Sequence, residues 1–165
     1  MKYDGDWKED EMNGWGTFIW KNEDYYVGEW KADKMHGKGV FHYKNGDKYD
    51  GYYKDDKRNG LGAFTLADGT KYEGDWLKEK KHGKGYYVSN GNTYTGDFKD
   101  DEKHGKGVFL WEDGDKYDGD WKMGKRHGKG VFTAKDGSKY NGDWVDCKRH
   151  GKGTFVDANG DKYTG

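Results

Sequence analysis

One phrase, Tyr-x-Gly-x-aromatic, recurs along the whole chain at nearly constant spacing. Its tyrosines are Tyr3, Tyr26, Tyr49, Tyr72, Tyr94, Tyr117, Tyr140 and Tyr163. Successive tyrosines are 23 residues apart, except for an interval of 22 between Tyr72 and Tyr94. A fixed period of this length indicates an array of structural repeats. We therefore interpret residues 1–165 as one array of seven units, with a partial eighth unit at Tyr163.

The composition agrees with an ordered array only because of its aromatic residues. Leu, Ile, Val and Phe number 19 of 165 residues and 37% of the chain is charged, which is usual for disordered chains. However, aromatic residues make up 18% and recur at fixed positions with many of the 29 glycines. Proline is absent, as suits a continuous ladder of backbone hydrogen bonds.

Each unit contains two runs that alternate with period two, as β-strands do. Around Tyr117 these runs are 105–110 and 117–121, with Asp113-Gly114 between them. Asn-Gly or Asp-Gly between alternating runs predicts a β-hairpin, because both residues tolerate positive φ. The equivalent tips are Asn22-Glu23, Asn45-Gly46, Asp68-Gly69, Asn90-Gly91, Asp136-Gly137 and Asn159-Gly160.

We therefore predict an all-β fold, an elongated single-layer antiparallel ribbon of stacked β-hairpins. Short linkers such as 122–127 would join successive hairpins. At about 4.8 Å per strand, the stack would be roughly 65–70 Å long. The missing residue of the fourth unit lies near Asn90-Gly91, where we expect a tighter tip and an unbroken aromatic face.

The alternation puts aromatic and glycine residues of both runs on one face. We expect rings to lie over the bare backbone of neighbouring strands and to replace an aliphatic core. Aromatic pairs across strands contribute roughly 0.2–1 kcal/mol each. Self-packing comes first in this interpretation, and a groove for a partner helix or strand is added to it. The candidate partner-binding residues are Trp30, Tyr53, Trp76, Phe98, Trp121 and Trp144.

Charge is divided along the chain although the net charge is only −1. Near-neutrality gives no reason to expect a nucleic-acid partner. The hairpin tips are acidic, and the later linkers are basic. An alternative hypothesis is therefore a peripheral membrane module that binds acidic phospholipids. Its candidate lipid-binding residues are Lys125, Arg126, Lys129, Lys148, Arg149 and Lys152.

No constellation of side chains indicates catalysis. Equivalent histidines of successive units would lie roughly 9–10 Å apart, too far to share one metal ion. We expect them instead to bond a linker carbonyl. Repeated carboxylates have nearly equal environments, whereas a catalytic pair needs different ones. We therefore expect no catalytic residues, no metal site and no cofactor.

Two further expectations concern the setting of the array. An open stack of hairpins has an unpaired strand at each end, so self-association through end strands is a possible partner interaction. No apolar run is long enough for a signal peptide or a membrane-spanning helix, so we expect a cytoplasmic protein.

The repeated Tyr-x-Gly-x-Trp/Phe phrase, variable linker and Gly-x-Gly strand resemble the MORN (membrane occupation and recognition nexus) repeat. The resemblance covers the whole chain, with Tyr53 and Phe98 in place of Trp and with Asn13 and Asn59 in place of His. The frequent His-Gly-x-Gly form is most similar to radial-spoke-head members. The resemblance implies scaffolds of cilia and cytoskeleton, membrane-contact proteins, or accessory domains of larger enzymes. We predict a non-catalytic interaction scaffold of cytoskeletal or ciliary assemblies.

Overall fold

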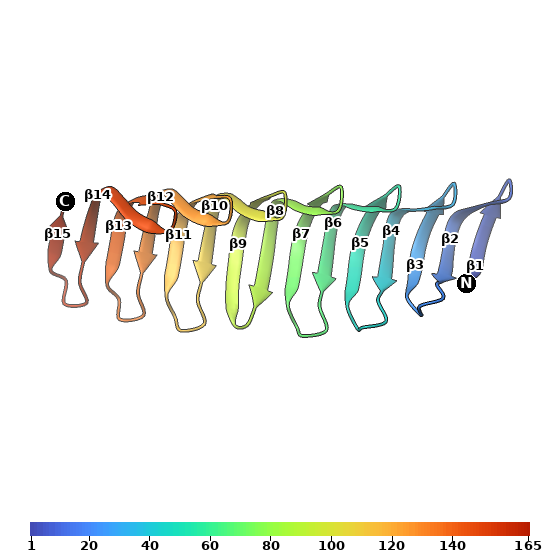
Figure 1. Cartoon of the computed structure of the whole chain (residues 1–165), viewed down its shortest axis with the longest axis horizontal. Helices are drawn as coiled ribbons and strands as arrows, with labels where there is room; N and C mark the ends of the chain where they lie inside the picture. The colour runs from blue at the N-terminus through green and yellow to red at the C-terminus, as the bar shows by residue number, and fades with distance from the viewer. The chain divides into compact units, whose positions relative to one another are not determined.

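The computed structural model describes residues 1–165 and contains fifteen β-strands and no helix. It accordingly has no helix that could span a membrane. Strands that follow one another in the chain pair antiparallel, which confirms the predicted all-β fold of stacked hairpins. The chain forms two compact units, Met1–Lys81 and His82–Gly165, here called unit 1 and unit 2. In each unit the strands form an open sheet with loops and turns at opposite edges (Figure 1).

The strands of unit 1 are β1 (Lys2–Lys8), β2 (Glu11–Ile19), β3 (Tyr25–Lys31), β4 (Lys34–His42), β5 (Lys48–Lys54), β6 (Lys57–Thr65) and β7 (Lys71–Leu77). The unit boundary lies within β8 (Lys80–Ser89). The further strands of unit 2 are β9 (Asn92–Lys99), β10 (Glu102–Leu110), β11 (Lys116–Lys122), β12 (Lys125–Thr133), β13 (Lys139–Val145), β14 (Lys148–Val156) and β15 (Lys162–Thr164).

The predicted linkers are wrong, because they are two-residue turns between paired strands. Residues 122–127 comprise the end of β11, a turn at Met123-Gly124 and the start of β12. Both turn residues have positive φ, 49° and 76°. Such turns match the twist of the strands that they join. The first turn residue is rarely glycine here, so the sequence pattern did not indicate a turn.

The predicted Asp-Gly tips occupy five-residue loops. In Trp111–Asp115, the Trp111 N–H donates to the Asp115 carbonyl (2.9 Å) and the Gly114 N–H donates to the Trp111 carbonyl (3.0 Å). The fourth tip is shorter, because Asn90-Gly91 alone connects Ser89 and Asn92, which pair directly. This confirms the predicted tighter tip. The aromatic face continues past it in unit 2, where Tyr94 is fully buried.

The core consists of tyrosine rings that lie on glycine backbone, as predicted. Tyr117 is fully buried, and Gly119 and Gly130 pair across β11 and β12. A Cβ atom on Gly130 would lie only 2.5 Å from Cζ of Tyr117. The Tyr117 hydroxyl donates to the Asp120 carbonyl (2.9 Å). Each tyrosine thus uses both the space above glycine and a carbonyl three residues further on.

Neighbouring repeats are locked together by edge-to-face ring contacts. The Tyr117 ring lies 5.2 Å from Trp121 of its own repeat and 5.4 Å from Trp144 of the next, at interplanar angles of 88° and 85°. Tyr26 contacts Trp30 and Tyr53 in the same way in unit 1. Edge-to-face geometry places the positive ring edge against the negative ring face. The alternating rings therefore form a continuous stack within each unit.

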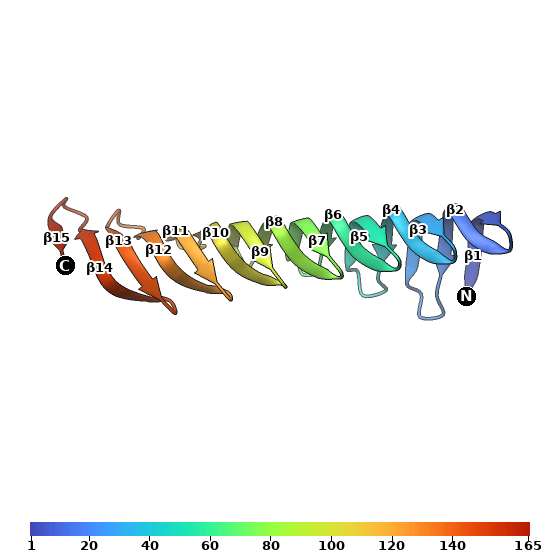
Figure 2. The same ribbon diagram turned by 90° about the horizontal axis from the view of Figure 1, so that it is seen from above.

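A β-bulge bends one strand of each repeat and places a carboxylate at the bend. Residues 127–129 of β12 oppose Asp120 alone, with Gly128 at φ 68°. One Asp120 oxygen accepts the Lys129 N–H (2.9 Å), and the other forms an ion pair with Lys106. Bulges increase strand bending, and Figure 2 shows the curvature of β12 and β14.

The same bonds hold the carboxylate in its charged form. Burial disfavours the charge of Asp120, but hydrogen bonds from Lys106 and from the Lys129 N–H outweigh burial and lower the pKa of Asp120 below its ordinary value. The pKa of Asp97 is lowered in the same way, by Lys84 and the Lys106 N–H against the effect of burial.

We expect Gly130→Ala to destabilise the protein severely, because its methyl group must displace the Tyr117 ring. The loss in free energy of unfolding should be about 3–5 kcal/mol, as for other losses of a buried aromatic side chain. Gly137→Ala is the control: its φ of 89° is unfavourable for alanine, but no atom lies within 4 Å. It should cost only about 1–2 kcal/mol. Equal losses in urea unfolding would contradict tyrosine-on-glycine packing.

Acid should weaken the bend at Asp120. Since the folded-state pKa is lowered, the unfolded chain binds more protons, and the stabilisation is present above about pH 4 and lost as pH falls below it. Asp120→Asn should lower the urea midpoint at neutral pH and reduce its decline on acidification. Asp118→Asn is the control, because this exposed carboxylate lies 3.9 Å from Lys116. A pH dependence unchanged by Asp120→Asn would show that the bend does not titrate.

Candidate functional site

The six aromatic residues predicted to bind a partner are core residues. Trp30, Tyr53, Trp76, Phe98, Trp121 and Trp144 are only 3–6% exposed. Their exposure is low because each ring packs against tyrosines of its own and the preceding repeat, as at Trp144. A partner on this face would therefore meet other side chains first.

The indoles are fixed by a hydrogen bond as well as by rings. Trp144 Nε1–H donates to the Gly130 carbonyl (3.1 Å), and Trp121 Nε1–H donates to the Gly107 carbonyl (3.0 Å). Trp30 and Trp76 make the same bond in unit 1. A buried indole N–H needs such an acceptor. Each tryptophan therefore fits a site built by the preceding repeat.

A second line of rings lies beside this core and is only half-buried. We call it the ring row. It comprises Phe18, Trp20, Phe41, Tyr43 and Phe64 in unit 1, and Phe109, Trp111 and Phe132 in unit 2. In unit 1 its successive ring centroids are 4.6, 5.1, 4.5 and 5.9 Å apart. In unit 2 Trp111 lies 4.5 Å from Phe109 and 5.8 Å from Phe132.

The sequence analysis missed Trp20, Tyr43 and Trp111 as candidate site residues. Each stands two positions after a phenylalanine of the core face. Continuing the period-two alternation by one step, into the hairpin loop, would have found them. The Asn-Gly and Asp-Gly signals drew the expected strand end before these residues.

Cations from the supposed linkers lie over the same rings. The Arg126 guanidinium is 4.7 Å from the Trp144 ring and 5.6 Å from Trp111. Arg58 lies 4.5 Å from Trp76 and 5.1 Å from Phe64. Cations over ring faces at these distances are attracted by the ring quadrupole.

The two arginines differ in how far their charge is compensated. Arg58 forms an ion pair with Glu79 at 3.0 Å. The Arg126 guanidinium instead donates to the neutral Cys147 carbonyl at 3.2 Å. The ring row of unit 2 therefore carries a less compensated positive charge than that of unit 1.

The six predicted lipid-binding residues do not act as one basic surface. Arg126 and Arg149 lie over rings, with Arg149 4.8 Å from Tyr140. Lys129 forms an ion pair with Asp143, and Lys125 lies 4.0 Å from Asp146. Lys148 and Lys152 are exposed.

Buried hydroxyl groups on this face are donors and not acids. Burial raises the pKa of Tyr94 and Tyr117 far above the usual range, and the nearby carboxylates Asp97 and Asp120 add to the effect. Both hydroxyls donate to backbone carbonyls, at 2.8 and 2.9 Å. Their structural bonds are therefore retained over the whole ordinary pH range.

The histidines do not form the expected bond to a linker carbonyl at two positions. Nδ1 of His36 and of His127 is buried and has no hydrogen-bond partner. The carbonyl before each histidine already accepts a turn N–H, from Asp56 and from Cys147. His36 Nδ1 lies 3.7 Å from an Asp55 carboxylate oxygen. No group of three or more His, Cys, Asp or Glu side chains has metal-binding geometry.

Comparison with known proteins agrees with this repeat structure. The MORN repeat model matches seven consecutive segments: 3–25, 26–48, 49–71, 72–93, 94–116, 117–139 and 140–162. A comparison with curated proteins gives no match.

Among solved structures, the chain is similar to the TCP domain of SAS-4 (dCPAP) from Drosophila melanogaster, which was solved in complex with a proline-rich motif of Ana2 (dSTIL). The TM-score is 0.55 at 17% identity, over 92% of this chain and 83% of that one. At this identity the likeness concerns the fold alone. The seven matched repeats cover nearly the whole sequence, and the chain belongs to the MORN repeat family.

Proposed function

We propose that this protein is a non-catalytic interaction scaffold whose ring row binds an extended, proline-rich peptide segment. The observation that carries the proposal is the continuous line of half-buried rings beside a core that is already complete. Proline-rich segments dock on aromatic surfaces at low entropic cost, because their extended conformation is preformed. The proline-rich motif bound by the structurally similar TCP domain supports the same class of ligand.

The charges beside the rings favour an acidic residue in such a segment. In unit 2, Arg126 lies 5.6 Å from Trp111 and 5.8 Å from Phe132 and donates to a neutral carbonyl. A guanidinium over rings can bind a carboxylate while the rings hold prolines. In unit 1 Glu79 already occupies Arg58. An acidic proline-rich peptide should therefore prefer unit 2.

The proposal includes a cellular setting. We place the scaffold in a cytoplasmic assembly of the cytoskeleton or cilium, on the basis of its family. Repeated, nearly equal surfaces suit a protein that holds partners in line. Colocalisation of a fluorescent fusion with microtubules or cilia would agree with this setting, and a uniformly diffuse distribution would contradict it.

Peptide binding can be tested by calorimetric titration with a synthetic proline-rich peptide that contains one glutamate. Trp111→Ala should weaken binding at least about tenfold, which corresponds to about 1.4 kcal/mol. Arg126→Met should weaken this peptide but not its glutamine counterpart.

Trp15→Ala is the matched control, since Trp15 is 53% exposed and alternates to the opposite face from Gly16 and Phe18. It should bind the peptide as the unmodified protein does. Binding that survives Trp111→Ala, or that Trp15→Ala abolishes, would place the peptide elsewhere. Equal binding to vesicles of phosphatidylserine in place of the peptide would favour the lipid alternative.

A further inference from the structure

The last complete strand of unit 2, β14, is only partly covered on its outer edge. The short strand β15 pairs with it at three positions, from Val156↔Lys162 to Thr154↔Thr164, and Gly153 and Gly165 exchange backbone hydrogen bonds (2.7 and 3.0 Å). In contrast, β10 pairs with β11 at six positions, from Gly105 to Leu110. All three residues of β15 are exposed.

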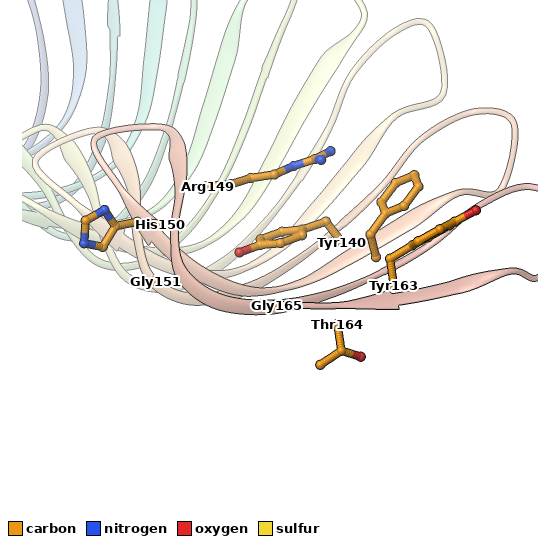
Figure 3. Close-up of a pocket in the computed structure, with 9 residues that line it drawn as sticks. Tyr140, Arg149, His150, Gly151, Tyr163, Thr164 and Gly165 are labelled. Carbon is orange, nitrogen blue, oxygen red and sulfur yellow. The ribbon is translucent and has the colours of Figure 1, made fainter.

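An open depression of about 540 Å³ lies beside this edge. Tyr140, Arg149, Gly153, Phe155 and Tyr163 are among the residues that line it. Figure 3 shows Tyr140 and Arg149 on the inner side of the curved strands, and Thr164 pointing to the opposite side. Arg149 lies 4.8 Å from the Tyr140 ring and 5.5 Å from the Phe155 ring.

These residues repeat the site that holds Trp144 one repeat earlier. Trp144 contacts Tyr117 (5.4 Å), Arg126 (4.7 Å) and Phe132 (6.4 Å). Its indole also donates to the Gly130 carbonyl. Adding 23 residues to these four positions gives Tyr140, Arg149, Phe155 and Gly153. The depression therefore has every component of an indole site, and no tryptophan of this chain lies in it.

The strand that best fits this edge is present in the same chain. The seven residues of β1, Lys2–Lys8, read KYDGDWK, and β11, Lys116–Lys122, has the identical sequence. The strand that receives β11, β10, contains His-Gly-Lys-Gly-x-Phe, and β14 contains the same residues. Trp7, the counterpart of Trp121, is 60% exposed, whereas Trp121 is buried.

The charges of the two edges are also complementary. Between β10 and β11, Lys106 forms an ion pair with one oxygen of Asp120, whose other oxygen accepts a backbone N–H. Asp6 in β1 already accepts the Trp15 N–H through Oδ2 (2.9 Å), in the manner of Asp120. Lys152 of β14 occupies the position of Lys106 and is exposed.

We infer that β1 of a second copy of this chain binds to β14, displacing β15, so that copies associate head to tail. By the register of β10 and β11, Gly5 lies opposite Gly153 and Tyr3 opposite Phe155. Trp7 enters the indole site, and Asp6 pairs with Lys152. Because the two surfaces differ and lie at opposite ends of the chain, each bound copy presents a further site, and the assembly is an open series. This surface is separate from the ring row, so the inference does not depend on peptide binding.

The test is sedimentation velocity of the full chain over a range of concentrations. The unmodified protein should form a concentration-dependent ladder of species. Trp7→Ala removes the inserted indole, and Lys152→Glu places a carboxylate opposite Asp6. Each variant alone should remain monomeric where the unmodified protein associates. Trp15→Ala, which removes a similarly exposed indole from the adjoining strand, should associate normally.

Mixing the two variants distinguishes this contact from any symmetric one. Trp7→Ala retains a sound β14 edge, and Lys152→Glu retains a sound β1, so an equimolar mixture should form a 1:1 dimer and nothing larger. A mixture that stays monomeric would overturn the inference, as would self-association of either variant alone. The same holds for an unmodified protein that is strictly monomeric up to about 1 mM, the weakest affinity worth considering for this contact.

Discussion

The whole structure depends on tyrosine rings that lie flat against glycine backbone. Tyr117 covers Gly119 and Gly130, which pair across two strands, and no side chain larger than hydrogen fits there. This contact supplies apolar burial in a chain with very few aliphatic residues. It also allows one ring to contact two repeats at once, because nothing separates it from Trp144 of the next repeat.

Because the core is complete within each pair of repeats, function is left to what lies outside it. The tryptophans are consumed by packing and by bonds to carbonyls such as that of Gly130. The ring row at Trp20, Tyr43 and Trp111 is half-buried and beside cations, and it is there that we place peptide binding. The regularity has a second consequence: a strand such as β1, identical to β11, fits any equivalent edge.

Much of this could be predicted from the sequence, because period-two alternation and the spacing of Tyr117, Gly119 and Trp121 are local signals. The tight turns could not, since Met123-Gly124 adopts positive φ under the constraint of flanking strands and has no strong turn signature. Nor could the position of Arg126 over Trp144 be foreseen, because the bulge at Gly128 decides which linker side chains turn inward. The identity of a residue thus predicted its repeat position better than its surroundings.

The central claim, that ring-on-glycine contact holds the fold, is tested most directly by a double-mutant cycle between Tyr117 and Gly130 in urea unfolding. If the Gly130 methyl group is harmful only because it meets the Tyr117 ring, then Gly130→Ala should cost less than about 1 kcal/mol in a Tyr117→Ala background. The predicted coupling is about 2–3 kcal/mol, within the range for residues in direct contact. Strictly additive losses would contradict the account, because the glycine would then be required for a reason other than the tyrosine.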